Sequence, residues 1–318
     1  MAQSDCKWLK SATMTTPLNI YILDYPEAMQ SGVYGVQDLF TIANYQSGLE
    51  VFSTQILNKS SLPVAGHDSI IFIPPCLAAE QPEFSDPDTL SLLKAWHDSG
   101  AILVAACAGV FWLANAGLLD GRQVTTHWLL CQRLADNYPR INAVSQRDMV
   151  VDEGSIVTAA GLCAFQDLTL HLIARFAGFD LAKKVADYCL LDFSGRLQAY
   201  YQRFYPCLSH GDRLMLKAQN FCADQIYSNI SIVQIAEHCC LSQRTLLRRF
   251  KLATSYSPKQ YLIQLRIEKA KQLMELEKIS IEELSYKLGY TDTSNFIKIF
   301  KKVAGVTPAE FRSRFIST

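Results

Sequence analysis

The second half of the chain contains one sequence pattern twice, and this repeat constrains the fold more than any other feature. The stretch ISIVQIAEHCCLSQRTLLRRFKLATSYSPKQYL begins at Ile230, and ISIEELSYKLGYTDTSNFIKIFKKVAGVTPAEF begins at Ile279. The copies are 49 residues apart before a central turn and 50 apart after it. Internal repetition of this kind indicates two copies of one supersecondary unit. We therefore expect the C-terminal part to be built from two similar helical motifs.

Each copy has the pattern of a short helix, a tight turn and a second helix. Ser231 and Ser280 are typical N-cap residues for the two first helices. The apolar spacing of the second helices predicts buried faces made by Leu246, Leu247 and Phe250, and by Phe296, Ile299 and Phe300. The same spacing leaves outside Arg244, Arg248 and Arg249 in one copy, and Asn295, Lys298 and Lys301 in the other. This arrangement is typical of a helix-turn-helix, whose second helix enters a major groove.

A further helix start follows each unit. Ser257-Pro258 and Thr307-Pro308 each place an N-cap residue before a proline at the first helical position. Residues 257–278 have apolar side chains at helical spacing. This segment predicts one long helix that connects the two units and holds them apart.

The formal net charge is zero, but it is unevenly distributed. Residues 1–214 carry 14 Lys and Arg against 21 Asp and Glu, whereas residues 215–318 carry 16 against 9. A basic compact domain is typical of nucleic-acid binders, although a basic face can also be merely solvated. The repeat favours the first interpretation, with double-stranded DNA as the partner.

The C-terminal hundred residues resemble the AraC/XylS-type DNA-binding domain. The resemblance lies in SQRTLLRRFK, in SPKQYL with LRIEKAKQLM, in LGYTDTSNFIKIFKK and in GVTPAEFR. It implies two recognition helices and a set of base-reading positions: Gln243, Arg244, Leu247 and Arg248 in the first helix, and Thr293, Ser294, Asn295 and Lys298 in the second.

Two residues depart from the pattern of that family. Cys240 stands where the turn usually has glycine, so a residue with a Cβ must accept an unusual backbone angle. Lys298 replaces a common arginine and cannot form the two-pronged contact to guanine, which favours a phosphate contact.

The first part of the chain alternates apolar β-like runs with helical patterns. The runs are LNIYIL, SIIFIPP, AILVAA and SIVTAA, and the helical patterns include TLSLLKAWHDSG and LCAFQDLTLHLIARFAG. Such alternation predicts an α/β fold with a flavodoxin-like, mostly parallel sheet. We expect a flexible N-terminus over 1–16, this domain over 17–193, a linker over 194–212 and the all-α DNA-binding domain over 213–318.

Cys107 follows one of these strands in LVAACAGVFWLANAG and could be a nucleophile, part of a ligand pocket or a packing residue. Ala106, Ala108 and Gly109 leave room for the sharp strand-to-helix turn of a nucleophile elbow. A thiol at a helix N-terminus is also expected to favour its thiolate.

Three blocks, AACAG, LLDGRQVTTHW and VTAAGLCAFQDLTLHL, resemble the ThiJ/PfpI-like branch of the class I glutamine amidotransferase-like fold. The resemblance covers about residues 18–190, and in catalytic members it implies a cysteine near a histidine and a carboxylate. Here the cysteine is followed by Ala108 rather than histidine, and Gly32 stands where an acid is expected, with Glu27 off register. Pro75 replaces a glycine of the oxyanion pair and has no N–H to donate.

These departures favour a pocket over an active site, and we expect no catalytic residue. The candidate pocket consists of Cys107, His127, Cys76, Gly32 and Gly161. His127 could equally be a satisfied core histidine.

Other classes of protein are disfavoured by the remaining features. The ten cysteines include no CxxC pair and no metal-ligand spacing, so we expect reduced thiols, no metal and no cofactor. The apolar run 101–119 is interrupted by Gly109 and Asn115 and does not suit a membrane span. The N-terminus lacks a secretory signal pattern, so a cytoplasmic location is expected.

The order of the two domains resembles that of the GlxA-like transcriptional regulators. The resemblance implies a homodimeric, sequence-specific regulator whose first domain binds a small metabolite, with an amine or amino-acid derivative as the suggested class. The alternatives are a cysteine-dependent hydrolase or glyoxalase-like enzyme with a DNA-binding domain, and a regulator whose first domain only dimerises.

Overall fold

The computed structural model describes residues 16–57, 66–76, 84–193 and 195–315. The chain divides into two compact units, Met1–Gln198 and Ala199–Thr318. The segment 1–16, which the sequence predicts to be flexible, lies outside the described residues except for Thr16. Within the described ranges, no helix has the length and apolar character needed to span a bilayer.

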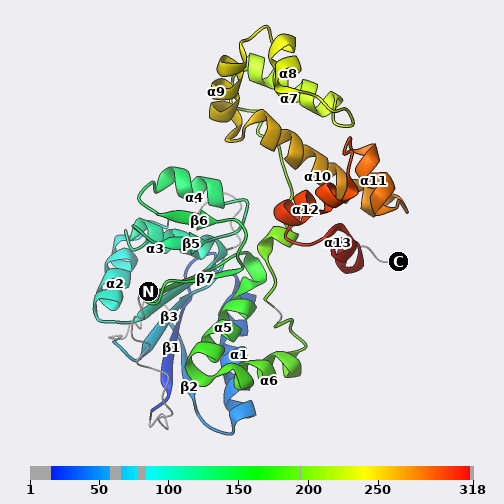
Figure 1. Ribbon diagram of the computed structural model, residues 1–318. Coiled ribbons are helices and arrows are strands. Elements are labelled where there is room, and N and C mark those ends of the chain that lie inside the picture. Colours follow the sequence, from blue (N-terminus) through cyan, green and yellow to red (C-terminus); the bar gives the residue numbers. More distant parts are fainter. Residues whose placement is uncertain (1–15, 58–65, 77–83, 194, 316–318) are drawn as a thin grey trace, which may run out of the picture. The chain divides into compact units, whose positions relative to one another are not determined.

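The first unit is built on a six-stranded sheet with the strand order β2-β1-β3-β4-β8-β7 (Figure 1). Neighbouring strands are parallel except β7, which is antiparallel to β8. The strands are β1 (Leu18–Leu23), β2 (Phe52–Leu57), β3 (Ser69–Ile73), β4 (Ile102–Ala106), β7 (Val150–Asp152) and β8 (Ile156–Ala159), with a separate parallel pair β5 (Gln123–Thr125) and β6 (Ala143–Ser145). All residues of β3 and β8 are buried, as expected for strands covered on both faces.

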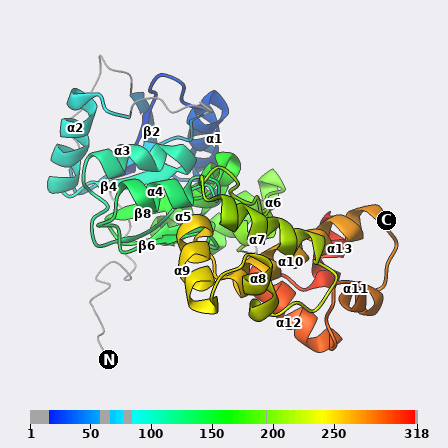
Figure 2. The ribbon, with the colours of Figure 1, turned by 90° about the horizontal axis from the view of Figure 1, so that it is seen from above.

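Helices cover both faces of this sheet. Helices α1, α5 and α6 pack together on one face, and α2 and α3 lie on the other (Figure 1, Figure 2). Their bounds are α1 (Gln30–Ser47), α2 (Pro87–Asp98), α3 (Val110–Asn115), α4 (Cys131–Asn137), α5 (Phe165–Ala177) and α6 (Phe179–Cys189), with short 3-10 turns η1 (Cys107–Gly109) and η2 (Leu162–Ala164). The predicted mostly parallel α/β fold is confirmed, and its five parallel strands follow the flavodoxin-like order.

The second unit is all helical within the described residues. A 3-10 turn, η3 (Gln198–Tyr200), stands at the boundary, and the helices are α7 (Arg213–Asp224), α8 (Ile232–His238), α9 (Gln243–Thr254), α10 (Pro258–Leu276), α11 (Ile281–Lys287), α12 (Thr293–Ala304) and α13 (Pro308–Phe315). The two predicted helix-turn-helix units are therefore α8–α9 and α11–α12, and the predicted connecting helix is α10.

Helix α10 belongs to two hydrophobic cores. Its N-terminal part contributes Tyr261 and Leu262 to a core with α7, α8 and α9. Its C-terminal part contributes Ile267 and Leu273 to a core with α11, α12 and α13. One rigid helix thus supports both helix-turn-helix units, which fixes the spacing of their second helices.

The helix starts predicted from sequence are confirmed. Ser231 and Ser257 form capping boxes with the glutamine three residues later. Ser280 caps α11. Thr307 Oγ1 accepts a hydrogen bond of 3.2 Å from the backbone N–H of Glu310.

The unusual backbone angle predicted for Cys240 is also present. Cys240 has φ 54°, and Gly289, its counterpart in the second copy, has φ 76°. Glycine adopts this left-handed region at little cost, whereas a residue with a Cβ is strained there. The first turn therefore holds strain that the second turn avoids.

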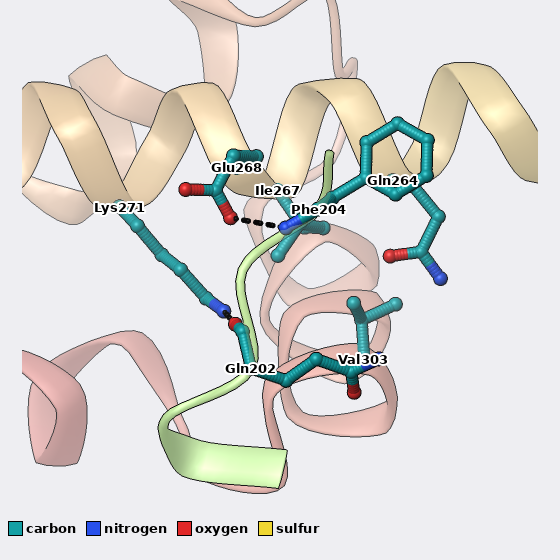
Figure 3. A pocket seen from close by; sticks show the side chains of 7 residues that line it. All are labelled: Gln202, Phe204, Gln264, Ile267, Glu268, Lys271 and Val303. Carbon is teal, nitrogen blue, oxygen red and sulfur yellow. Dashed lines mark hydrogen bonds between the residues drawn. The ribbon is translucent and has the colours of Figure 1, made fainter. Parts of the chain in front are cut away.

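Residues 202–204, which precede α7, lie along α10 (Figure 3). Lys271 Nζ donates a 2.7 Å hydrogen bond to the carbonyl oxygen of Gln202, and a carboxylate oxygen of Glu268 accepts one of 3.1 Å from the N–H of Phe204. Arg203 pairs with Glu268 at 3.2 Å and also with Glu275. The cavity left beneath this segment measures only about 10 Å³. It has room for no more than about one water molecule, so the segment is closely packed on α10.

Candidate functional site

Cys107 occupies a strained elbow at the carboxyl end of β4. Strand β4 ends at Ala106, Cys107 takes φ 53°, and η1 leads into α3. Thr126 Oγ1 donates a 2.7 Å hydrogen bond to the Cys107 carbonyl oxygen, which helps to hold the turn. A non-glycine residue in this region of backbone space is a frequent mark of a functional site. The predicted strand-to-helix elbow is thus present.

The thiol of Cys107 is buried and protonated, contrary to the prediction from its helix N-terminus. Burial raises the pKa of Cys107 to about 12, and the nearby Cys76 adds to the rise. The backbone N–H groups of Ala108 and Gly161 lower this pKa but do not outweigh the burial. Only 4% of the residue is exposed, so solvation of a thiolate is largely lost. The elbow geometry is therefore not accompanied by an activated nucleophile.

Most of the candidate pocket residues meet around this elbow. Cys76, 4% exposed, interacts electrostatically with Cys107, and the N–H of Gly161 hydrogen-bonds to the thiol. A Cβ added to Gly161 would lie 3.9 Å from Cδ2 of His127, so these two residues are close neighbours. The structure thus brings together Cys107, Cys76, Gly161 and His127.

Gly32 lies against the proline that replaces the oxyanion glycine. A Cβ added to Gly32 would lie 2.9 Å from Cδ of Pro75. An acidic side chain at this position would require Pro75 to shift. The glycine at position 32 and the proline at position 75, which both depart from the catalytic pattern, are therefore sterically compatible. The first helix therefore offers no carboxylate at this position.

His127 has the character of a neutral histidine. Burial lowers the pKa of His127. Its Nδ1 accepts a 3.2 Å hydrogen bond from the N–H of Leu129, which leaves Nε2 as the N–H donor. It can donate a hydrogen bond to a ligand but carries no fixed charge.

The sequence did not single out two aromatic residues near the elbow. Tyr25, at 6% exposure, donates a 2.7 Å hydrogen bond to the carbonyl oxygen of Pro74 and interacts electrostatically with Cys76 and Cys107. The Trp112 ring is 5.8 Å from that of Tyr25, and its Nε1–H has no hydrogen-bond partner among the described residues. Tyr25 is distant from Cys107 in the sequence, and Trp112, five positions after Cys107, has the pattern of an ordinary apolar residue of the following helix.

The first candidate DNA-reading surface lies on α9. Gln243, Arg244, Leu247 and Arg248 are all exposed. Neither Arg244 nor Arg248 pairs with an acidic side chain in the part of the chain that the structure describes. Two free guanidinium groups four positions apart on one helix can both reach the same groove.

Two predictions for α9 are wrong. Leu247 is 41% exposed rather than buried, because Leu246 and Phe250 alone fill the core side of the helix. Arg249 is half-buried rather than free, because it forms two hydrogen bonds with Asp212 at the N-terminus of α7. Arg249 is thus committed to the fold.

The second candidate surface lies on α12. Ser294, Asn295 and Lys298 are exposed and Thr293 is half-buried. Asp292 caps the helix by accepting hydrogen bonds from the N–H groups of Ser294 and Asn295. Because Asp292 accepts the free N–H groups at the start of α12, the side chains of Ser294 and Asn295 are not needed for capping. They remain available for contacts outside the helix.

Comparisons with known proteins agree with both halves of this architecture. Residues 235–314 match the helix-turn-helix domain family, and residues 70–175 match the DJ-1/PfpI family. HTH-type transcriptional regulator ArgR from Pseudomonas aeruginosa is 28% identical over 75% of this chain and 72% of its own. HTH-type transcriptional regulator GlxA from Rhizobium meliloti is 25% identical over 75% of this chain and 74% of its own. The crystal structure of an AraC family transcriptional regulator from Pseudomonas putida, 17% identical, has a TM-score of 0.46 and covers 54% of this chain and 100% of its own.

A DJ-1/PfpI-like domain followed by two helix-turn-helix units defines a DNA-binding transcriptional regulator. The chain combines an AraC-type helix-turn-helix domain with an N-terminal DJ-1/PfpI domain, and over three quarters of its length it is similar to transcriptional regulators such as ArgR and GlxA.

An enzyme also shares part of the sequence. Isonitrile hydratase from Pseudomonas putida is 32% identical over 104 residues, which is 33% of this chain and 44% of that enzyme. The relatives that align over three quarters of the chain are instead named as transcriptional regulators. The chain is therefore a regulator rather than an enzyme.

Proposed function

We propose that the first unit binds a small metabolite beside Cys107 and that binding controls how the second unit holds promoter DNA. The observation that carries this proposal is a hydrogen-bonded route from the elbow to the end of the first unit. Thr126 Oγ1 binds the Cys107 carbonyl, and Gln198 Nε2 donates a 3.2 Å hydrogen bond to the carbonyl oxygen of Thr126 and one of 3.0 Å to Thr125 Oγ1. A ligand that shifts the elbow would act on Gln198, the last residue of that unit.

The chain beyond Gln198 leads directly to the DNA-binding helices. Residues 202–204 are held by Glu268 and Lys271 of α10, the helix that supports both helix-turn-helix units. A displacement that starts at Gln198 can therefore reach α10 through the chain itself. This route supports a sensor rather than a passive dimerisation module.

The proposed effector pocket comprises Cys107, His127, Cys76, Gly161 and Gly32. Its neutral histidine, the protonated thiol of Cys107 and the unpartnered Trp112 Nε1–H suit recognition by hydrogen bonds and packing. The resemblance to GlxA-like regulators suggests an amine or amino-acid derivative. Glu27, which interacts electrostatically with Tyr25, supplies an acidic group near the site for such a cation.

We propose that α9 and α12 read DNA through residues of their N-terminal halves, which are exposed except for the half-buried Thr293. The proposed contacts are Gln243, Arg244, Leu247 and Arg248 on α9, and Thr293, Ser294, Asn295 and Lys298 on α12. The free guanidinium groups of α9 favour base contacts, whereas the single ammonium group of Lys298 favours phosphate.

We propose a homodimer, formed through the first unit. An exposed aromatic and aliphatic group lies at the C-terminal ends of α1 and α6, with Tyr45 73% and Leu190 92% exposed. The Tyr45 ring lies 6.2 Å from that of Tyr188, so the group is contiguous. A contiguous apolar surface of this kind is typical of an interaction site. Sedimentation of the full chain would test it: Tyr45→Glu with Tyr188→Glu is expected to give a monomer, and an unchanged species would contradict this surface.

The proposed domain limits are 17–193 for the sensor, 194–212 for the linker and 213–318 for the DNA-binding domain. We further propose that the protein acts in the cytoplasm.

A thermal-shift screen of the full chain against amines and amino acids tests the sensor. A ligand of the native state raises the melting temperature. Cys107→Ser is expected to change the ligand concentration at which the melting temperature rises. Gln198→Ala is expected to bind the ligand as before, but the ligand should no longer change operator binding. Gln132→Ala, on the surface of α4, serves as the control. Absence of any stabilising ligand would favour a dimerisation module, and turnover that disappears in Cys107→Ser would favour an enzyme.

A further inference from the structure

A second site lies within the DNA-binding unit, in a groove of about 370 Å³ between the two helix-turn-helix units. This volume is in the range of small-molecule sites. The groove is lined by the start of α8, one side of α10, the turn before α12 and α12 itself. The lining residues used below are Ile230, Ile263, Arg266, Tyr290, Asn295 and Ile299.

Arg266 places a buried positive charge in the wall of the groove. Only 7% of it is exposed, and its Nε and Nη2 atoms donate to the carbonyl oxygens of Ile226 at 3.0 Å and Ser228 at 2.6 Å. It forms no ion pair with any acidic residue that the structure describes. Buried cations are normally matched by a negative charge, because desolvation of an unmatched charge is costly. The charge of Arg266 is therefore balanced by carbonyl dipoles and by the Tyr290 side chain, and by no carboxylate that the structure describes.

Tyr290 places an unused hydrogen-bond donor beside this charge. The residue is 8% exposed, and the Arg266 guanidinium carbon lies 5.4 Å from the centre of its ring. The hydroxyl proton finds no acceptor among the described residues. Arg266 offers only donors, so it cannot fill this role. A buried hydroxyl whose proton has no acceptor is uncommon and calls for an acceptor from outside the fold.

The rest of the lining combines apolar side chains with polar ones such as Lys259 and Asn295. Ile230, Ile263 and Ile299 are half-buried, and they come from the loop before α8, from α10 and from α12. A ligand for this groove thus needs an apolar body as well as an anionic group.

We propose that this groove binds a small amphipathic carboxylate. Its carboxylate accepts the hydroxyl proton of Tyr290 and faces the guanidinium of Arg266, while its apolar body packs on the three isoleucines. The site shares no residue with the elbow around Cys107, so it does not depend on the effector proposed there. Because Asn295 and Ile299 of α12 line the groove, an occupant contacts the second recognition helix and changes DNA binding through it.

Binding of 1-naphthoate to the full chain tests the site, with octanoate as a second carboxylate and 1-naphthamide as the neutral match. We expect Tyr290→Phe, which removes only the hydroxyl, to weaken naphthoate binding about tenfold in calorimetry. Tyr286→Phe removes an exposed hydroxyl of the same unit and is expected to change nothing. The amide is expected to bind about tenfold more weakly than the acid.

Two further variants test whether naphthoate binds in this groove rather than at the elbow. Ile263→Trp fills the groove and is expected to abolish naphthoate binding while circular dichroism stays native. Cys107→Ser is expected to leave naphthoate binding unchanged, which separates this site from the elbow. The proposal is overturned if neither carboxylate binds, if Tyr290→Phe and Ile263→Trp both bind like the wild type, or if amide and acid bind equally.

Discussion

Asp212 caps α7 and at the same time holds Arg249 of the recognition helix α9. One carboxylate oxygen accepts from Arg249 Nε at 3.0 Å and the other from Nη2 at 2.7 Å. The hydrogen bond with Arg249 lowers the pKa of Asp212 most, and the N–H groups of the helix cap lower it further. The position of α9 is therefore fixed by a residue 37 positions away in the sequence, outside the helix-turn-helix.

Replacing Asp212 by Ala should lower the free energy of unfolding by about 1–2 kcal/mol, because it removes both an N-cap and an ion pair. Urea unfolding measures this change. Asp224→Ala, at the opposite end of α7, is the control and should have little effect. Operator affinity should fall for matched and scrambled DNA alike, and a loss restricted to matched DNA would instead assign Arg249 or Asp212 to base reading.

Replacing Arg248 by Ala should relax sequence preference, because a two-pronged contact with guanine gives about 1–3 kcal/mol of discrimination. Lys298→Ala should weaken binding to all sequences alike and reduce the salt slope by about one unit. Titrations on matched and scrambled operators at several salt concentrations separate the two effects. Lys184→Ala removes the same charge from the first unit as a control, and equal losses on both DNAs for Arg248→Ala would defeat its assignment to base reading.

The residues of α9 show which features of the DNA-reading surface can be predicted from the sequence. The repeat predicted both helix-turn-helix units and their caps, because apolar spacing and N-caps are local signals. It could not separate Arg248 from Arg249, because the distinction depends on Asp212, which only folding brings near. Leu247 was assigned to the core for a similar reason: the width of the buried stripe depends on what packs against it.

In the first unit, too, some features were predictable from the sequence and others were not. Its buried strands β3 and β4 were visible as continuous apolar runs, whereas β5, β6 and β7 have only three residues each and give little periodic signal. Cys107 and its elbow were predictable from the sequence. The contact between Thr126 and Gln198 was not, because it depends on residues distant in the chain.

Cys107 should resist alkylation at neutral pH. Its pKa of about 12 leaves almost no thiolate, and the residue is buried. Iodoacetamide at pH 7.5, followed by mass spectrometry, should modify the exposed Cys163 and Cys240 well before Cys107. Modification of Cys107 at the same rate as Cys163 would show an open, activated thiol, and would revive the enzyme hypothesis. Denatured protein, in which all thiols react alike, provides the reference.

Lys271 should make stability increase with pH above neutrality. Burial lowers its pKa from 10.5 to about 8. Between these two values the unfolded chain holds a proton that the folded chain has released, so the free energy of unfolding rises with pH through this window. The charged form, present in the fold below about pH 8, destabilises it, although its Nζ still binds the Gln202 carbonyl.

Comparison with Lys271→Met isolates this effect, because cysteine and tyrosine titrations are common to both proteins. From pH 7 to pH 10, the stability of the wild type relative to Lys271→Met should rise by on the order of 2 kcal/mol. Chemical unfolding at several pH values measures it, and Lys278→Met, which removes an exposed amine, should show little pH dependence relative to the wild type. A wild-type advantage that is flat or falls with pH would mean that Lys271 stays charged in the fold, and that residues 202–204 are held on α10 by a charged hydrogen bond.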